Sequence, residues 1–235
     1  MVTTSFGAPG ESEEQTAIRV RKAARALPRH DLGHAYGHVS ARLDADRFLV
    51  CPPKPMGLIE AGEPCTVVPV EGPLPDGVLG EVRIHQQIYK RRPEVGGIVR
   101  TLVHSVLTLS TMRRTPKVRH GFGAYFRPQA ALWDDPMLVR NEDAAIGVAE
   151  TLGRGRAVVM RGNGLVTCGA SVEEAAVMVF YLDQAAKTEL SVLACAANPE
   201  VEPVEFTPAQ AEARDVSAGM IFERMWDYLT DGDPE

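Results

Sequence analysis

The stretch that most constrains the fold is residues 96–110, GGIVRTLVHSVLTLS. Residues 96–103 form an apolar run of strand length, and the apolar residues that follow have the spacing of a helix. A buried strand that passes directly into a helix is typical of α/β proteins, in which helices cover a sheet. The same stretch carries Arg100 and His104 on an otherwise apolar element. A cation and an imidazole in such a place indicate either a functional site or a structural ion pair.

Helix and strand patterns alternate along the rest of the chain, but hairpins also occur. Helices are predicted at residues 13–27, ending before Pro28, at 80–92, ending at Pro93, and at 141–153, 171–196 and 207–229. Strands are predicted at 37–53 as a hairpin, at 65–72, and at 156–169 as a hairpin with Asn163 and Gly164 in its tight turn. Residues 113–140 are irregular and rich in Pro and Gly, and a loop of that length is usually functional. This order predicts a mixed α/β sandwich with helices on both faces.

Composition limits the partners and the compartment. The net charge of −6 and the pI of about 5.6 give no electrostatic case for a nucleic-acid or anionic-membrane partner. No apolar run approaches the roughly 18 residues of a membrane span, and the polar start lacks the features of a signal peptide. The four scattered cysteines favour free thiols in a cytoplasmic protein. We expect a disordered tail at residues 1–14 and one domain at residues 15–230.

The strand at residues 96–103 places a cation at the end of a buried element. Side chains alternate along a strand, so Ile98, Arg100 and Leu102 share one face, and His104 joins them if the strand continues. Sites in α/β folds gather at strand ends. A buried arginine is rarely left unpaired, so a structural salt bridge is the alternative interpretation of Arg100.

Four segments resemble the class II aldolase/adducin family. They are GHVSARL, FLVCPP, GEVRIHQQIYKRRPEVGGIV and RGNGLVTCGASVEEAAVMVFYLDQAA, and the resemblance spans residues 15–195. It implies a three-layer α/β/α sandwich around a mixed, mostly antiparallel central sheet. It also implies a homotetramer with each site at a subunit boundary, and a small-molecule substrate.

The resemblance implies a metal site whose ligands this chain lacks. The family holds a divalent metal with two histidines on the buried strand and a third in the hairpin turn, next to a glutamate that precedes the strand. Glu81 matches that glutamate, but Arg100 and Leu102 stand at the strand positions and Asn163 at the hairpin position. Arginine and leucine cannot bind a divalent cation. We therefore predict no metal in this position.

The resemblance and the residue types together predict the catalytic groups. Glu81 is expected to act as acid/base and Arg100 as the anchor of an anion, because a guanidinium binds a carboxylate through two parallel hydrogen bonds. His38, His104 or His120 would relay a proton. A different site remains open, in which Glu81, His104 and His120 hold a zinc, manganese or iron ion. The structural alternatives are a helix-terminal glutamate, a turn histidine at position 38 and a helix-capping histidine at position 104.

Four further residues are expected to contact the substrate: Ser40, Lys54, His120 and Tyr228. Ser40 matches a serine of the family motif, and Tyr228 lies on a C-terminal helix that could complete the site of a neighbouring subunit. CPPKPMG replaces the phosphate loop of the family. Its prolines lack the backbone N–H donors that bind a phosphate, and the charge of Lys54 would replace them only in part. We expect a substrate without phosphate.

The sequence thus predicts a lyase-like enzyme that acts on a small carboxylated or keto substrate by decarboxylation or aldol-type cleavage. Bacterial specialised or catabolic metabolism is the expected setting. Three alternatives stay open: a metal-free isomerase or cyclase of a natural-product pathway, a non-catalytic adducin-like domain, and a metal-dependent oxygenase, for which the sequence offers no assigned histidine ligands. Retention of Glu81 beside arginine and histidine favours an enzyme over a domain that has lost catalysis.

Overall fold

The computed structural model describes residues 12–198, 200 and 202–235. These residues form a seven-stranded sheet in the order β3-β2-β1-β4-β7-β6-β5. The pair β5–β6 is parallel and the other neighbouring pairs are antiparallel. The strands are β1 Gly37–Arg42, β2 Arg47–Val50, β3 Thr66–Pro69, β4 Gly97–Thr101, β5 Ala131–Trp133, β6 Ala157–Met160 and β7 Leu165–Gly169.

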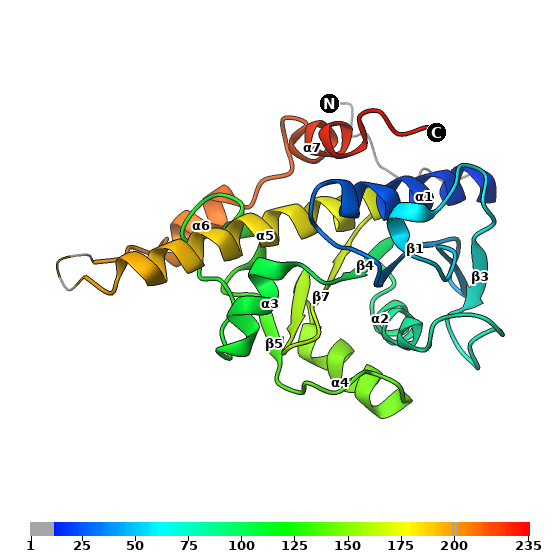
Figure 1. Cartoon of the computed structure of the whole chain (residues 1–235), viewed down its shortest axis with the longest axis horizontal. Coiled ribbons are helices and arrows are strands. Elements are labelled where there is room, and N and C mark those ends of the chain that lie inside the picture. The colour runs from blue at the N-terminus through cyan, green and yellow to red at the C-terminus, as the bar shows by residue number, and fades with distance from the viewer. Residues whose placement is uncertain (1–11, 199, 201) are drawn as a thin grey trace.

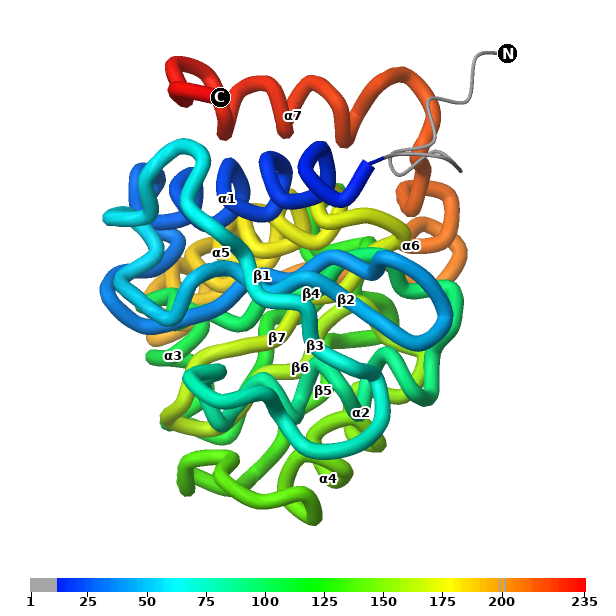
Figure 2. Tube along the Cα trace, turned by 90° about the vertical axis from the view of Figure 1, so that its right-hand side faces the viewer, coloured from blue at the N-terminus to red at the C-terminus, as the bar shows by residue number. Residues whose placement is uncertain are grey.

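Helices cover both faces of this sheet (Figures 1 and 2). One face carries α1 (Glu13–Arg29), α3 (His104–Thr111) and α5 (Val172–Cys195), with α7 (Ile221–Thr230) packed on the outer side of α1 and α5 (Figures 1 and 2). The other face carries α2 (Arg83–Arg91) and α4 (Glu142–Leu152). Strand alternation divides the core in two, since Val99 packs under the first group of helices and its neighbour Ile98 under the second. The predicted three-layer α/β/α sandwich with a mixed, mostly antiparallel sheet is confirmed.

The paired glycines before β4 allow the first turn of α5 to lie against the strand. A Cβ atom at Gly97 would lie 2.3 Å from the backbone nitrogen of Val172, and one at Gly96 would lie 2.0 Å from the carbonyl oxygen of Ala170. Ser171 caps α5 by accepting the Glu174 N–H, as its sequence position predicts. The Glu174 carboxylate accepts the N–H of Ala170. This contact fixes the start of α5 beside the strand that carries Arg100.

Several predicted boundaries differ from the observed ones. Glu81 lies in a short 3₁₀ helix, Gly80–Val82, and α2 begins only at Arg83. The predicted C-terminal helix is two helices, α6 (Pro208–Arg214) and α7. Residues 113–140 contain the 3₁₀ helix Gly123–Phe126 and the edge strand β5. A further 3₁₀ helix spans Met56–Leu58.

The predicted N-terminal tail and the described helix overlap at two residues. Ser12 caps α1, which begins at Glu13, so residues 13 and 14 form its first turn. Residues 1–11 of the predicted tail lie outside the described residues. No helix in the described part of the chain combines the length and the apolar character needed to cross a bilayer.

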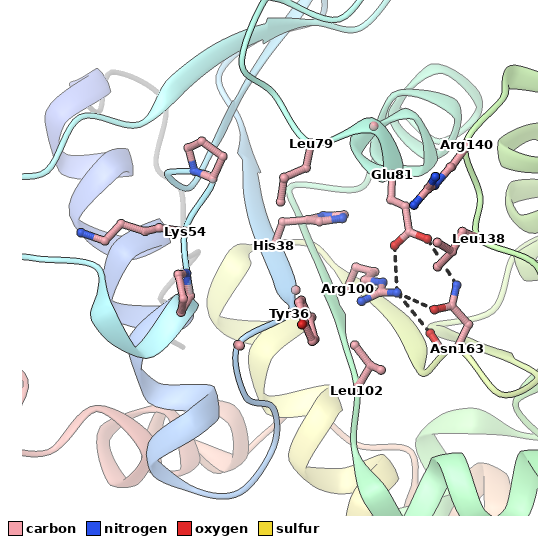
Figure 3. Close-up of a pocket in the computed structure, with 15 residues that line it drawn as sticks. Tyr36, His38, Lys54, Leu79, Glu81, Arg100, Leu102, Leu138, Arg140 and Asn163 are labelled. Carbon is pink, nitrogen blue, oxygen red and sulfur yellow. Dashed lines mark hydrogen bonds and ion pairs between the residues drawn. The ribbon is translucent and has the colours of Figure 1, made fainter.

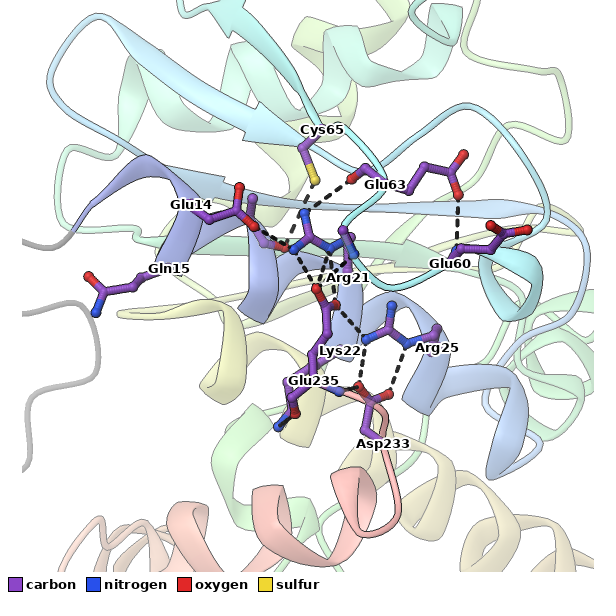
Figure 4. A network of polar contacts seen from close by, with 12 residues as sticks. Glu14, Gln15, Arg21, Lys22, Arg25, Glu60, Glu63, Cys65, Asp233 and Glu235 are labelled. Carbon is purple, nitrogen blue, oxygen red and sulfur yellow. Dashed lines mark hydrogen bonds and ion pairs between the residues drawn. The ribbon is translucent and has the colours of Figure 1, made fainter.

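Ion pairs tie the segment after α7 to α1 (Figure 4). Arg21, 1% exposed, contacts the Glu235 carboxylate at 2.5 Å and Glu14 at 2.8 Å. Arg25 contacts Asp233 at 2.5 Å and Glu235 at 2.8 Å. Burial raises the pKa of Glu235, but the hydrogen bonds from Arg21 and Arg25 outweigh it, so that the pKa falls to about 2. These contacts hold the C-terminal segment against the helical layer.

Candidate active site

A cavity of about 1080 Å³ opens at the ends of β1 and β4 (Figure 3). Its walls come from segments far apart in the sequence: the start of β1, residues 53–55, the 3₁₀ helix Gly80–Val82, the end of β4, residues 138–140 and the β6–β7 hairpin. The side chains that line it are Tyr36, His38, Pro53, Lys54, Pro55, Leu79, Glu81, Arg100, Leu102, Leu138, Arg140 and Asn163.

Glu81, Arg100 and Asn163 form a closed triangle on one wall. Arg100 Nη2 lies 2.8 Å from Glu81 Oε2 and donates to Asn163 Oδ1, also at 2.8 Å. Asn163 Nδ2 donates to Glu81 Oε1 at 3.3 Å, and the Val139 N–H donates to the same oxygen at 3.2 Å. Burial lowers the pKa of Arg100, and the charge of Glu81 partly opposes this effect. The triangle fixes one cation and one anion at the cavity surface.

Asn163 occupies a different position in the β6–β7 hairpin turn from the one predicted. Positive φ angles fall on Gly162 (69°) and Gly164 (84°), and the Asn163 N–H donates to the carbonyl of Met160. Asn163 is therefore not at the centre of a two-residue turn. It is 5% exposed and points at Arg100 and Glu81 (Figure 3), so the turn does not account for this asparagine by itself.

His38 begins a buried chain of hydrogen bonds that leads away from the cavity. Its Nδ1 lies 2.8 Å from His85 Nε2, His85 Nδ1 lies 2.6 Å from Ser40 Oγ, and Ser40 Oγ lies 2.9 Å from the Tyr89 hydroxyl. Burial lowers the pKa of His38 well below its ordinary value, and His85 and the Arg100 charge lower it further. Burial, with Arg100, likewise lowers the pKa of His85 to about 3. Both imidazoles are neutral at physiological pH.

The predicted site residues fall into two groups. Glu81, Arg100, His38 and Lys54 line the cavity, although Lys54 forms an ion pair with Glu63 at 2.9 Å. Ser40 is fully buried behind His38.

The remaining predicted residues, His104, His120 and Tyr228, do not line this cavity. His104 is exposed as the first residue of α3. The Nδ1 of His120 accepts the N–H of Phe122 at 3.3 Å, and burial lowers its pKa. Tyr228 is 59% exposed, and its ring packs beside His30. The alternative metal set of Glu81, His104 and His120 is not assembled at this cavity.

The donor atoms at the cavity do not fit the divalent metal of the family. The Arg100 guanidinium occupies the position beside Glu81, and Leu102 has no donor atom. Within residues 12–198, 200 and 202–235, no group of three or more His, Cys, Asp or Glu side chains could hold a metal ion. No chemical step is therefore assigned to a metal.

Three polar side chains that line the cavity, those of Asn163, Arg140 and Tyr36, were not predicted as site residues. Asn163 had a signal, because it stands where the family has a histidine, but a hairpin turn explained it equally well. Arg140 lies at the end of the long loop that was predicted to be functional. Tyr36, 68% exposed at the cavity, had no sequence signal, because nothing local indicates which loop side chains face a cleft.

Curated relatives of this chain include decarboxylases. A 3,4-dihydroxyphthalate decarboxylase from Terrabacter sp. (strain DBF63) is 28% identical over 207 residues, which cover 79% of this chain and 84% of the relative. Decarboxylase tropJ from Talaromyces stipitatus is 29% identical over 189 residues, which cover 69% of this chain and 71% of the relative.

Solved structures share the fold. An aldolase II superfamily protein from Pseudomonas syringae has a TM-score of 0.77 at 20% identity, covering 94% of this chain and 92% of its own. L-fuculose 1-phosphate aldolase from Glaciozyma antarctica PI12 has a TM-score of 0.75 at 20% identity, covering 95% of this chain and 93% of its own. The family model for the class II aldolase and adducin N-terminal domain matches residues 18–190. The family model covers most of the chain and the fold agrees with it, and the chain belongs to the class II aldolase and adducin family.

Proposed function

We propose that this protein is a decarboxylase that acts on a small carboxylated substrate without phosphate. The observation that carries the proposal is the triangle of Glu81, Arg100 and Asn163 on the cavity wall. It supplies a fixed cation for a carboxylate and an acid/base group beside it. The relatives named as decarboxylases support the same class of reaction.

Arg100 would bind the substrate carboxylate through its guanidinium fork. The C–C bond to the carboxylate then breaks, CO₂ leaves, and the electron pair passes to an oxygen conjugated with that carbon. Glu81 would deliver to the carbon a proton that comes from solvent. The net change is one carboxylate and one proton converted into CO₂ and a C–H bond.

The remaining walls favour a planar, unsaturated substrate. Leu79, Leu102 and Leu138 supply apolar surface, and Tyr36 supplies an aromatic ring. Lys54 is held by Glu63 at 2.9 Å, and prolines interrupt the N–H donors around it, so a phosphate has few partners. We therefore propose a hydroxylated aromatic carboxylate as the substrate class.

We further propose that the protein works as a homotetramer in the bacterial cytoplasm. The exposed ring of Tyr228 on α7 is then available to the cavity of a neighbouring subunit, as is the exposed His104. Four free cysteines among the described residues agree with a reducing compartment. Specialised or catabolic metabolism of aromatic acids would supply such a substrate.

Release of CO₂ from a panel of carboxylates tests the proposal. The panel contains 3,4-dihydroxyphthalate, mono- and dihydroxybenzoates, a β-keto acid, and L-fuculose 1-phosphate as an aldol substrate. We expect turnover of a hydroxylated aromatic carboxylate and its loss in Glu81→Gln. A folded protein that neither turns over nor binds any of these carboxylates would overturn the proposal.

A further inference from the structure

Two buried side-chain nitrogens that have no hydrogen-bond partner in the described part of the chain belong to residues that line the cavity. Within the described residues, His38 Nε2 and Arg100 Nε have no hydrogen-bond partner, although the two residues are only 2% and 4% exposed. They are direct partners across β1 and β4, so their side chains share one face and lie close together. Figure 3 shows both at the end of the cavity that also holds Glu81. Buried polar groups are normally paired, so these two unpartnered nitrogens point to a ligand that carries oxygen acceptors.

A count of donors and acceptors indicates which atom donates in each of the hydrogen bonds behind His38. Tyr89 is 2% exposed, and the only partner of its hydroxyl within the described residues is Ser40. If Tyr89 donates to Ser40, then Ser40 donates to His85 Nδ1, and His85 Nε2–H donates to His38 Nδ1. Each direction leaves one hydrogen without an acceptor inside the protein, at a cost of about 1–3 kcal/mol. In the opposite direction it is the Tyr89 hydrogen, which no ligand reaches, whereas in the first direction it is a hydrogen on His38, which lines the cavity. The favoured direction places the remaining ring hydrogen of His38 on Nε2.

We propose that Tyr89, Ser40 and His85 hold His38 in its neutral Nε2–H form, as a donor to the substrate oxygen that receives the electron pair when CO₂ leaves. This inference rests on the proposed function and defines its substrate class: a carboxylate whose reacting carbon is conjugated with a hydroxyl or keto oxygen. Arg100 binds the carboxylate and His38 binds that oxygen. Ser40, His85 and Tyr89 are positioning residues, since they act through His38.

A neutral donor suits this position for two reasons. An imidazolium beside the Arg100 guanidinium would place two cations together in a buried site, which the low pKa of His38 reflects. A neutral N–H stabilises negative charge on oxygen without first giving up its proton, as donors of an oxyanion hole do. A ligand that lacks the oxygen leaves the N–H unpaired, so the site discriminates against it.

Nitrogen NMR of protein labelled with ¹⁵N-histidine reads the tautomer directly. The chain has six histidines, and His38→Gln assigns the resonances of His38. We expect a neutral Nε2–H ring between pH 6 and pH 8. Tyr89→Phe and Ser40→Ala should give a tautomer mixture, and Ser40→Thr should restore the Nε2–H form. Tyr181→Phe is the matched control, because this buried tyrosine donates to Ile221 on a different helix. A charged His38, or one protonated at Nδ1, would overturn the proposal.

Ligand probes test the substrate class without requiring turnover. Added 3,4-dihydroxybenzoate should shift the His38 Nε2 resonance, and benzoate should not; equal shifts from the two probes contradict the assignment of His38 to the substrate oxygen. If decarboxylation is found, Tyr89→Phe should lower kcat about tenfold with KM nearly unchanged. A purely structural role would lower Tm without altering the tautomer. If no substrate is decarboxylated, the proposed function is wrong. The tautomer of His38 and the shifts of its resonance with the two ligands still test the proposed role of His38 independently.

Discussion

Arg100 and Glu81 form an ion pair with 2.8 Å between Nη2 and Oε2, in which the arginine side chain is 5% exposed and the glutamate side chain 16% exposed. Arg100 comes from the central strand β4 and Glu81 from the 3₁₀ helix before α2. In the family resemblance, Arg100 stands at the position of a metal-ligating histidine. On that resemblance, a fixed guanidinium takes the place beside the glutamate that the divalent cation of the family would occupy, so the site keeps a positive charge, of smaller magnitude, on a different chemical group.

Glu81→Gln should abolish most of the decarboxylation. The amide keeps the shape of the side chain but cannot carry the proton to carbon, so we expect kcat to fall by about 10²–10⁴-fold. The assay is CO₂ release under saturating substrate. Glu71→Gln is the control, because Glu71 pairs with Lys90 outside the cavity. Equal activity of Glu81→Gln and the wild type would remove Glu81 from the mechanism.

Arg100→Gln should destabilise the protein more than the double variant Arg100→Gln, Glu81→Gln. Removal of one partner leaves the other as an unpaired and partly buried charge. We expect a coupling energy of about 1–3 kcal/mol from urea unfolding of the two single variants and the double variant. The exposed pair Lys90 and Glu71 should give less than about 1 kcal/mol in the same cycle. Strictly additive effects of Arg100 and Glu81 would contradict the ion pair.

Much of the fold followed from local patterns in the sequence. The strand predicted within residues 96–103 is β4, Gly97–Thr101, and the helix predicted at residues 171–196 is α5, Val172–Cys195. The break between α6 and α7 was missed, because the apolar spacing continues through residues 215–220, and the end of a helix there depends on tertiary contacts.

The candidate site could be predicted only in part. Arg100 and Glu81 were found because one is a cation in an apolar strand and the other matches a family motif. The partnership of His38 with Arg100 depends on the register of β1 against β4, which no local pattern specifies. His85 and Tyr89 stand four residues apart on α2 and so share a face, but only the packing of α2 on β1 reveals that Ser40 lies between them.

Metal analysis of the purified protein should find less than stoichiometric zinc, manganese and iron. The reason is the donor set, since a guanidinium and a leucine replace two ligands at the cavity. Dialysis against a chelator should leave the rate of decarboxylation unchanged. Stoichiometric metal, with activity lost on chelation and recovered on its return, would mean that a neighbouring subunit or another set of residues completes a metal site.

Gly164→Ala should destabilise the protein more than Gly77→Ala. Both glycines have a φ of 84°, so the backbone strain of the new side chain is similar, at about 1–2 kcal/mol. A Cβ atom at Gly164 would also lie 2.3 Å from the carbonyl oxygen of Thr101, whereas one at Gly77 meets nothing within 4 Å. Gly164→Ala should therefore displace the hairpin that carries Asn163 and lower activity as well as Tm. Equal loss of stability in the two variants would show that the hairpin does not depend on this close approach.

Glu235→Gln should destabilise the protein at neutral pH and lose this effect in acid. The pKa of Glu235 is lowered from 4.5 to about 2 in the folded protein, so the unfolded state binds the proton more readily. The carboxylate therefore stabilises the fold above its unfolded pKa, by roughly 2–3 kcal/mol, and this contribution disappears as pH falls from about 4.5 to about 2. Urea unfolding of the wild type and the variant should give curves that converge over that range. Glu205→Gln, which alters a half-exposed carboxylate paired with Lys117, should change stability by less than about 0.5 kcal/mol. A constant difference between Glu235→Gln and the wild type at all pH values would contradict the ion pair with Arg21.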